Sequence, residues 1–324
     1  MMQDKRVGLV LGAGGVLGGA WLAGALSALR TVTGWDPLAA HVMLGTSAGS
    51  VFAALLAGGV AASRLLPAAP LAGLADDRWV LAELAAEESY RLPRRLPAFG
   101  PGSLGLVARA LREGAAFRAL CGLLPRGLVP TAAIEATIRR AVPTGWARRP
   151  QCWIVTCDYG TGQRVVFGRP GAPRPSLARA VAASCAIPGF FRPVQVGGRF
   201  YVDGGLHSLT NLDVLAGQDL DLIVALNPMS GPTVAAGWNP VSRLTAAMRR
   251  RSARQMAAEA AVLRRRGTEV LLLEPTERDL AEIGGNVMDA RRARRVAETA
   301  VATTTERLRK LRRRLVPDRP QTYS

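Results

Sequence analysis

The sequence predicts an α/β protein with a mostly parallel sheet, because two apolar strands near its start each lead through a turn into a helix. Val7 to Leu11 is a short, fully apolar run that ends in a glycine-rich turn, and a helix is expected from about Gly19 to Thr31. Ala39 to Leu44 is a second apolar run, followed by a tight turn and a small-residue helix over 48–57. Such repeated strand–turn–helix units are typical of parallel βαβ winding.

The pattern changes between about residues 61 and 130, where repeated prolines divide the chain into short helical pieces. Leu104 to Leu124 is one such piece, with a large apolar face. We interpret 61–130 as an inserted helical cap. Its apolar side chains either line a groove, dip into a membrane, or form a core helix pair that covers the sheet.

Regular α/β elements return after the cap. The sequence predicts further strands and helices that alternate as in the first part of the chain. The expected strands are Cys152 to Cys157, Arg164 to Phe167, Asp221 to Leu226 and Glu269 to Leu273, and the expected helices are Thr131 to Ala141, Ser176 to Ser184, Val241 to Arg266 and Ala290 to Leu315. We assign residues 1–275 to one domain and 276–324 to an Arg-rich helical extension.

The composition is basic and apolar. The 42 Lys+Arg residues exceed the 24 Asp+Glu residues and give a net charge of +18. This charge either favours an anionic membrane surface or nucleic acid, or reflects a coding bias toward Arg and Ala. No signal peptide or uninterrupted membrane span is recognised, and the four scattered cysteines are expected to be reduced and buried. We therefore expect a cytoplasmic protein, either free or peripheral on a membrane.

Ser47 is the candidate nucleophile. It lies in Gly45-Thr46-Ser47-Ala48-Gly49, between the predicted strand and the small-residue helix. A serine on such a strand-to-helix turn, a nucleophile elbow, has an exposed hydroxyl near the positive end of the helix.

Asp203 is the candidate base. The chain has two histidines, His41 and His207, and neither lies where a Ser-His-Asp hydrolase would place its catalytic histidine. Asp203 follows a short apolar strand and precedes Gly204 and Gly205, so a neighbouring backbone can approach it closely. Burial beside the serine would raise its basicity above that of an ordinary aspartate. The alternative for this motif is a simple Asp-Gly turn.

The glycine-rich turn after the first strand is the candidate oxyanion hole. Backbone N–H groups of Gly14, Gly15 and Val16, unshielded by large side chains, can converge on a developing negative charge at a helix start. A dinucleotide site is disfavoured because Leu17 occupies the sixth position of the fingerprint, and a P-loop is disfavoured because its lysine is missing.

Four blocks in this order resemble the patatin-like phospholipase family. They are the turn from Gly12 to Gly18, the Ser47 pentapeptide, Ala183-Ser184-Cys185-Ala186-Ile187-Pro188, and Asp203-Gly204-Gly205. The resemblance implies a three-layer α/β/α fold, a Ser47–Asp203 dyad, an oxyanion hole around Gly14 and Gly15, and hydrolysis of lipid acyl esters without a metal or cofactor. The glycines expected to support these motifs are Gly12, Gly18, Gly45, Gly49, Gly204 and Gly205.

The sequence departs from the family pattern at Ala13 and at Leu17, where the family has glycine and a basic residue. The departure at Leu17 keeps open a non-catalytic lipid- or membrane-binding protein with the same fold. The arginines beyond residue 290 lack interleaved aromatic residues for base stacking, which disfavours specific nucleic-acid recognition. The expected partners are a lipid ester substrate and an anionic membrane surface.

Overall fold

A computed structural model describes residues 2–66, 100–147, 150–232 and 240–315. It contains one eight-stranded sheet in the order β5-β6-β3-β2-β1-β7-β8, with β4 also paired to β3. The strands are β1 (Val7–Leu11), β2 (Val42–Thr46), β3 (Gln151–Asp158), β4 (Arg164–Phe167), β5 (Val194–Val196), β6 (Arg199–Asp203), β7 (Leu222–Leu226) and β8 (Glu269–Leu273).

Strands β3, β2, β1, β7 and β8 are parallel, which confirms the mostly parallel sheet expected from the sequence. Strands β4 and β6 run antiparallel to β3, and β5 runs antiparallel to β6. The carboxyl ends of parallel strands meet at one edge of a sheet, and this edge is where α/β proteins place their ligands. The turns after β1, β2 and β7 all lie there.

The helices cover both faces of this sheet. They are α1 (Gly15–Thr33), α2 (Ala48–Ala57), α4 (Leu104–Arg112), α5 (Ala116–Leu123), α6 (Ala132–Ala141), α7 (Leu177–Ser184), α8 (Pro240–Arg265), α9 (Glu277–Ile283) and α10 (Ala293–Leu315). Short 3₁₀ turns are η1 (Met2–Asp4), η2 (Pro37–Ala39), η3 (Ala62–Leu65), η5 (Gly204–Leu206), η6 (Leu212–Leu215) and η7 (Ala290–Arg292).

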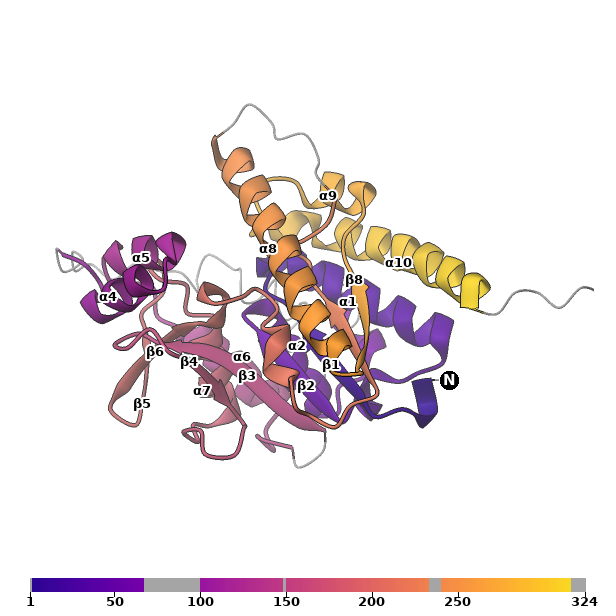
Figure 1. Ribbon diagram of the computed structural model, residues 1–324, viewed down its shortest axis with the longest axis horizontal. Coiled ribbons are helices and arrows are strands. Elements are labelled where there is room, and N and C mark those ends of the chain that lie inside the picture. The colour runs from indigo at the N-terminus through magenta and orange to yellow at the C-terminus, as the bar shows by residue number, and fades with distance from the viewer. Residues whose placement is uncertain (1, 67–99, 148–149, 233–239, 316–324) are drawn as a thin grey trace, which may run out of the picture.

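The described core has one large cluster on each face of the sheet and a third, small cluster, in which side chains of α4 and α5 pack on β3 and β6. On one face, side chains of α1, α2, α6, α7 and α10 pack on alternate strand residues such as Leu9 and Ile154. On the other face, α8 and η6 pack on the intervening residues, such as Val10 and Val155. Helix α8 crosses its face of the sheet diagonally (Figure 1). The three-layer α/β/α arrangement is therefore confirmed.

Helix α1 is a core helix. By length and composition it is the one described helix that could cross a membrane, but 72% of its apolar window is buried inside the protein. It packs against α10 so closely that a Cβ added at Gly24 would lie 2.3 Å from the Ala297 carbonyl oxygen. Helix α10, which we assigned to an extension, thus shares the main core with residues of the first domain, and the boundary at residue 275 stays a prediction.

The described part of the predicted cap contains the 3₁₀ turn η3 and two short helices, α4 and α5, which replace the single helical piece expected over 104–124. The chain turns at Glu113 to Ala115, and Gly114 there has a positive φ of 63°. Helices α4 and α5 lie at the end of the molecule formed by β5 and β6, at the left in Figure 1. The rest of the predicted cap, 67–99, lies outside the described residues.

Candidate active site

Ser47 lies on a sharp turn between β2 and α2, with φ of 53° and ψ of −124°. A positive φ is strained for a residue with a side chain, and such strain persists only where the surroundings impose it. Two flanking glycines allow the turn by close backbone approach. A Cβ added at Gly45 would lie 2.5 Å from the Cα of Ser50, and one at Gly49 would lie 2.0 Å from the Leu11 carbonyl oxygen.

The backbone of Ser47 is fixed by hydrogen bonds on both sides. Its N–H donates to the Ser184 hydroxyl at 2.9 Å, and that hydroxyl donates to the Val155 carbonyl at 2.7 Å. The Ser47 carbonyl accepts a hydrogen bond from the Ser50 hydroxyl at 2.6 Å. The sequence marked Ser184 only as part of a family block, and the structure shows what its hydroxyl contacts.

Sheet register brings Asp203 to the same level as Ser47, on the other side of β3. Thr46 pairs with Val155, and the next residue of β3, Thr156, pairs with Asp203 on β6. Gly204 then lies directly on β3, where an added Cβ would be 2.5 Å from the Val155 carbonyl oxygen. This contact explains why a glycine must follow Asp203.

The Asp203 carboxyl group is buried and hydrogen-bonded. Its Oδ1 accepts the Gly205 N–H at 2.7 Å, and the Ser47 hydroxyl lies close enough to stabilise the ionised carboxylate. Burial raises the pKa of Asp203 to about 6, and the Gly205 N–H and the Ser47 hydroxyl oppose this rise. A carboxylate with such a pKa is ionised at neutral pH and is a stronger base than an ordinary aspartate.

The predicted oxyanion turn presents three amides in a row that bind no described acceptor. These are the N–H groups of Gly14, Gly15 and Val16, at the start of α1. The amides on either side already bond to carbonyls, Gly12 to Leu226, Ala13 to Leu209, Leu17 to Val287 and Gly18 to Gly14. Orphan amides at a helix N-terminus favour an anion, since they add to the helix dipole.

Side chains are excluded from this turn. A Cβ added at Gly14 would lie 2.7 Å from both the Cα of Gly18 and the Cγ of Pro228, and Gly15 has a positive φ of 63°. Gly49, two residues after Ser47, lies against the same turn, with a built Cβ 2.7 Å from the Gly12 carbonyl oxygen. Leu17 is fully buried among core side chains.

Asn211 connects the serine turn to the aspartate turn, and sequence reasoning missed it. Its side-chain amide donates to the Thr46 hydroxyl at 3.1 Å and to the Gly204 carbonyl at 3.3 Å. Its side-chain oxygen accepts from Arg164 at 3.1 Å. Asn211 is buried and, like Ser47, has a positive φ, here 52°. An Asn eight residues after Asp203 was the available signal, since Asn tolerates this conformation better than most residues.

Neither histidine is placed to act on Ser47. His207 is held through both ring nitrogens, with Nε2 3.1 Å from the Gly162 carbonyl oxygen and Nδ1 3.3 Å from Arg118. The carbonyl requires a proton on Nε2, so Nδ1 accepts from the guanidinium. Burial, together with the charge of Arg118, lowers the pKa of His207 to about 4, and the ring is neutral.

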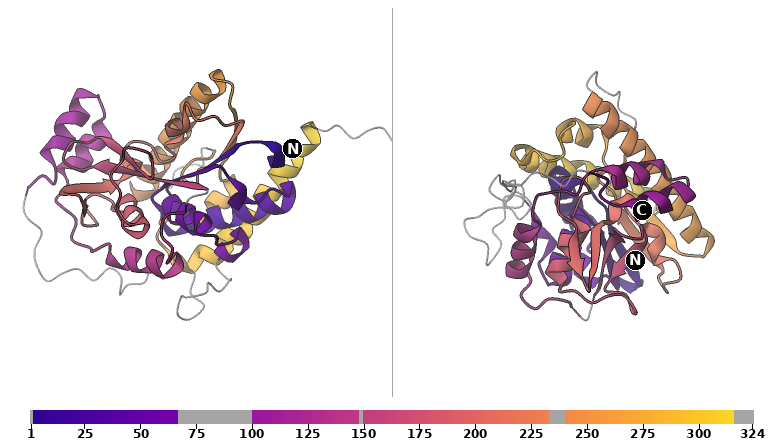
Figure 2. Two further views of the ribbon diagram at one scale, coloured as in Figure 1. Left: turned by 90° about the horizontal axis from the view of Figure 1, so that it is seen from below. Right: turned by 90° about the vertical axis from the view of Figure 1, so that its left-hand side faces the viewer.

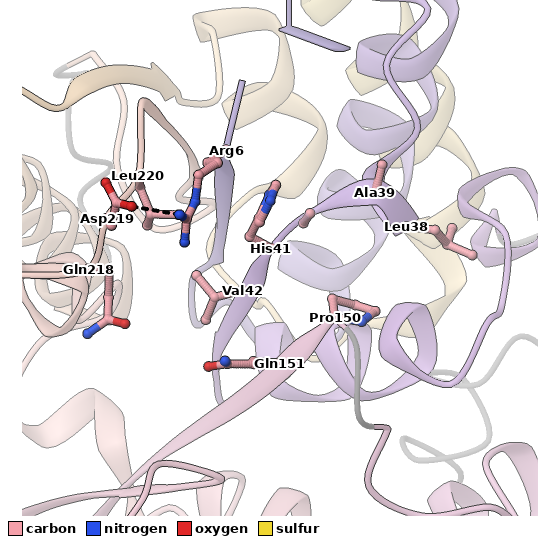
Figure 3. A pocket seen from close by; sticks show the side chains of 11 residues that line it. Arg6, Leu38, Ala39, His41, Val42, Pro150, Gln151, Gln218, Asp219 and Leu220 are labelled. Carbon is pink, nitrogen blue, oxygen red and sulfur yellow. Dashed lines mark hydrogen bonds and ion pairs between the residues drawn. The ribbon is translucent and has the colours of Figure 1, made fainter. Parts of the chain in front are cut away.

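His41 lines a hollow of about 560 Å³ at the opposite edge of the sheet. Figure 3 shows His41 among side chains from the amino-terminal ends of the strands, beside an Arg6–Asp219 ion pair of 2.6 Å. The lining residues include no serine or cysteine. Because this hollow lies at the amino-terminal ends of the strands and Ser47 follows the carboxyl end of β2, the two lie at opposite edges of the sheet.

A smaller, mostly apolar hollow lies next to the aspartate turn. It is formed between α5, the turn after Asp203 and α8, and its lining includes Phe117, Gly205, Leu209 and Met248. Arg251 lies over the Phe117 ring at 5.2 Å. The volume of this hollow is only about 40 Å³, and its lining includes neither Ser47 nor Asp203.

The four cysteines are free and buried, as expected from the sequence. Within the described ranges, no three His, Cys, Asp or Glu side chains lie close enough together to hold a metal ion.

Comparison with known proteins identifies the family. The family model for patatin-like phospholipases matches residues 9–216, which is more than half of the chain. Among solved structures, VipD from Legionella pneumophila is similar with a TM-score of 0.46 and 16% identity, over 94% of this chain and 67% of that chain. The type III effector ExoU is similar with a TM-score of 0.33 and 18% identity, over 94% of this chain and 53% of that chain, so the match spans about half of ExoU. The chain therefore belongs to the patatin-like phospholipase family of lipid ester hydrolases.

Proposed function

We propose that this lipid ester hydrolase cleaves fatty-acyl esters through a Ser47–Asp203 dyad and a covalent acyl-enzyme. The observation that carries the proposal is the buried Asp203 carboxylate, whose pKa burial raises to about 6, close to the hydroxyl of a serine on a strained turn. The three amides after β1 that bind no acceptor among the described residues support it, because they can supply the oxyanion site that ester cleavage needs.

In the first half-reaction, Ser47 Oγ bonds to the ester carbonyl carbon while its proton passes to Asp203. The carbonyl oxygen becomes an oxyanion and accepts hydrogen bonds from the amides of Gly14, Gly15 and Val16. When the tetrahedral intermediate collapses, the bond to the leaving alcohol breaks, and Asp203 returns the proton to that oxygen. The product is a fatty-acyl ester of Ser47.

In the second half-reaction, water gives a proton to Asp203 and bonds to the acyl carbon. The new oxyanion occupies the same amides, and its collapse releases the fatty acid. Ser47 Oγ leaves with the proton from Asp203, which restores the starting state. No redox partner or metal takes part in this sequence of steps.

Turnover of a medium-chain p-nitrophenyl ester tests the proposal. We expect Ser47→Ala and Asp203→Asn each to lower kcat by about 10³-fold or more, since one removes the nucleophile and the other the base, and neither works without its partner. His207→Asn is the matched control, because it alters a buried polar side chain four residues from Asp203. Its kcat should stay within about tenfold of wild type, as expected for a residue that positions no reacting atom. A His207→Asn loss equal to that of Asp203→Asn would contradict the dyad.

A further inference from the structure

Large apolar side chains gather, exposed, at the end of the molecule that carries α5. Leu120 and Leu123 are 59% and 53% exposed, and Ile187 and Phe190, in the loop after α7, are 43% and 45% exposed. Leu124 and Phe200 are 38% and 36% exposed. A soluble protein rarely leaves so many large apolar side chains together in water unless something binds them.

These residues form one surface, although they come from three segments. The Leu124 side chain lies on Gly189, where an added Cβ would be 2.9 Å from its Cδ1. The Phe190 carbonyl accepts the Val129 N–H at 3.1 Å, which ties the loop after α7 to the segment after α5. In the right-hand view of Figure 2, this end faces the reader, with α4 and α5 above the hairpin of β5 and β6.

Arginines accompany the apolar side chains. The guanidinium of Arg126 lies over the Phe200 ring at 5.2 Å, and Arg192 is exposed two residues after Phe190. Within the part of the chain that the structure describes, neither guanidinium has a carboxylate partner. Arg199, at the start of β6, is exposed but paired with Asp158 at 3.0 Å. The surface is thus apolar with free positive charge beside it.

The same loop reaches the candidate active site. Ser184, which holds the amide of Ser47, is the last residue of α7 before this loop, and the Ala186 carbonyl accepts the N–H of Asp203 at 3.0 Å. The next residue, Ile187, is exposed on the apolar surface. One short segment therefore contacts both members of the dyad on its inner side and carries exposed apolar residues on its outer side.

We propose that these residues form a docking face for an anionic lipid bilayer. The docking face comprises Leu120, Leu123, Leu124, Ile187, Phe190 and Phe200 with Arg126 and Arg192. Apolar side chains enter the boundary between headgroups and acyl chains of any bilayer, while arginines bind lipid phosphates and favour anionic membranes. The inference rests on the proposed function in one respect, since docking there brings the dyad to its lipid substrate.

Vesicle binding separates this face from the competing Arg-rich end of the chain. Binding is measured by co-sedimentation with vesicles of phosphatidylcholine alone or mixed with phosphatidylglycerol. The protein carries Ser47→Ala, so lipid is not consumed. One variant combines Leu123→Glu with Phe190→Glu, and a second combines Arg126→Glu with Arg192→Glu. The matched control combines Arg309→Glu with Lys310→Glu, on the exposed surface of α10 at the other end of the molecule.

We expect binding to the mixed vesicles to exceed binding to phosphatidylcholine alone. Each arginine near the surface should contribute about fivefold, so the arginine pair should lower binding to mixed vesicles by about tenfold or more. The apolar pair should lower binding to both vesicle types by a similar factor. The α10 control should bind like the parent protein.

The proposal is overturned if both docking-face variants bind like the parent, if the α10 control loses binding instead, or if the parent binds neither vesicle. Thermal melting checks that each variant is folded. The same substitutions are also made in protein that retains Ser47. These variants should turn over a soluble p-nitrophenyl ester at a rate within about twofold of wild type, since surface changes have small effects. If wild type fails to turn over that ester while the vesicle results hold, the dyad fails and the docking face stands.

Discussion

The backbone amide of Ser47 donates a hydrogen bond of 2.9 Å to the hydroxyl of Ser184. This bond fixes the strained turn and occupies the amide of Ser47, which therefore cannot stabilise an oxyanion. The unpaired amides after β1 remain for that purpose. Ser184 itself is anchored on β3 through the Val155 carbonyl, so the serine turn is built against the centre of the sheet.

Ser184→Ala should destabilise the fold by about 1–3 kcal/mol, because it leaves a buried N–H and a buried carbonyl without partners. It should also slow acylation, since the turn that presents the Ser47 hydroxyl loses one of its supports. Chemical denaturation and single-turnover acylation measure the two effects. Ser63→Ala, an exposed serine of η3, is the control and should change neither. Equal behaviour of the two variants would contradict the role of Ser184.

The pH profile of kcat/KM should report Asp203. Its pKa of about 6 means that the base is ionised above pH 7 and protonated below pH 5. We expect a plateau above about pH 7 and a fall of about tenfold per pH unit below 6. His207, with its pKa lowered to about 4, contributes no step between pH 6 and 8. A profile that is flat down to pH 4.5 would show that Asp203 is not the base.

The same burial makes ionised Asp203 a source of instability. Its pKa is about 6 in the folded protein and near 3.8 without burial, so the folded state holds the proton more tightly. Stability from this group is complete below about pH 4 and is lost as the pH rises through 6. Asp203→Asn should therefore raise the free energy of unfolding at pH 8, by up to about 3 kcal/mol. Urea unfolding of both proteins at pH 8 measures this, and a destabilised Asp203→Asn would contradict it.

Gly14→Ala tests the oxyanion turn. The added methyl group would overlap Gly18 and Pro228, so the turn must shift and move its amides. We expect kcat to fall by about 10²–10³-fold, the effect of losing one oxyanion donor. Gly285→Ala is the control, because its added methyl group has no neighbour within 4 Å and φ there is not positive. Both variants are compared by ester turnover after their melting temperatures show that they are folded. Full activity in Gly14→Ala would place the oxyanion elsewhere.

Local patterns in the sequence predicted the fold and the candidate residues. Strand, turn and helix around Ser47 are read from neighbouring residues, and so is the tight turn after Asp203. That these two turns meet follows from the register across β3, which no local pattern contains. The family resemblance indicated that Ser47 and Asp203 lie close together, and the strand register explains how.

Features that depend on distant contacts escaped prediction. Asn211 connects the two turns through hydrogen bonds to Thr46 and Gly204. Its left-handed backbone conformation, which allows these bonds, is set by the fold. The exposure of Leu120 and Leu123 was equally inaccessible, because an apolar face in sequence does not reveal whether another element covers it. The packing of α10 on α1 also depends on a distant contact, at Gly24.

Covalent labelling by a fluorophosphonate, with the modified residue located by mass spectrometry, is the decisive test of the Ser47–Asp203 dyad. The reagent reacts only with an activated serine, so the account predicts one adduct, on Ser47. Ser47→Ala should remove the adduct, and Asp203→Asn should slow its formation by about 10²-fold or more while the protein stays folded. An adduct on another serine, or a folded wild type that takes up no label, would contradict the Ser47–Asp203 dyad.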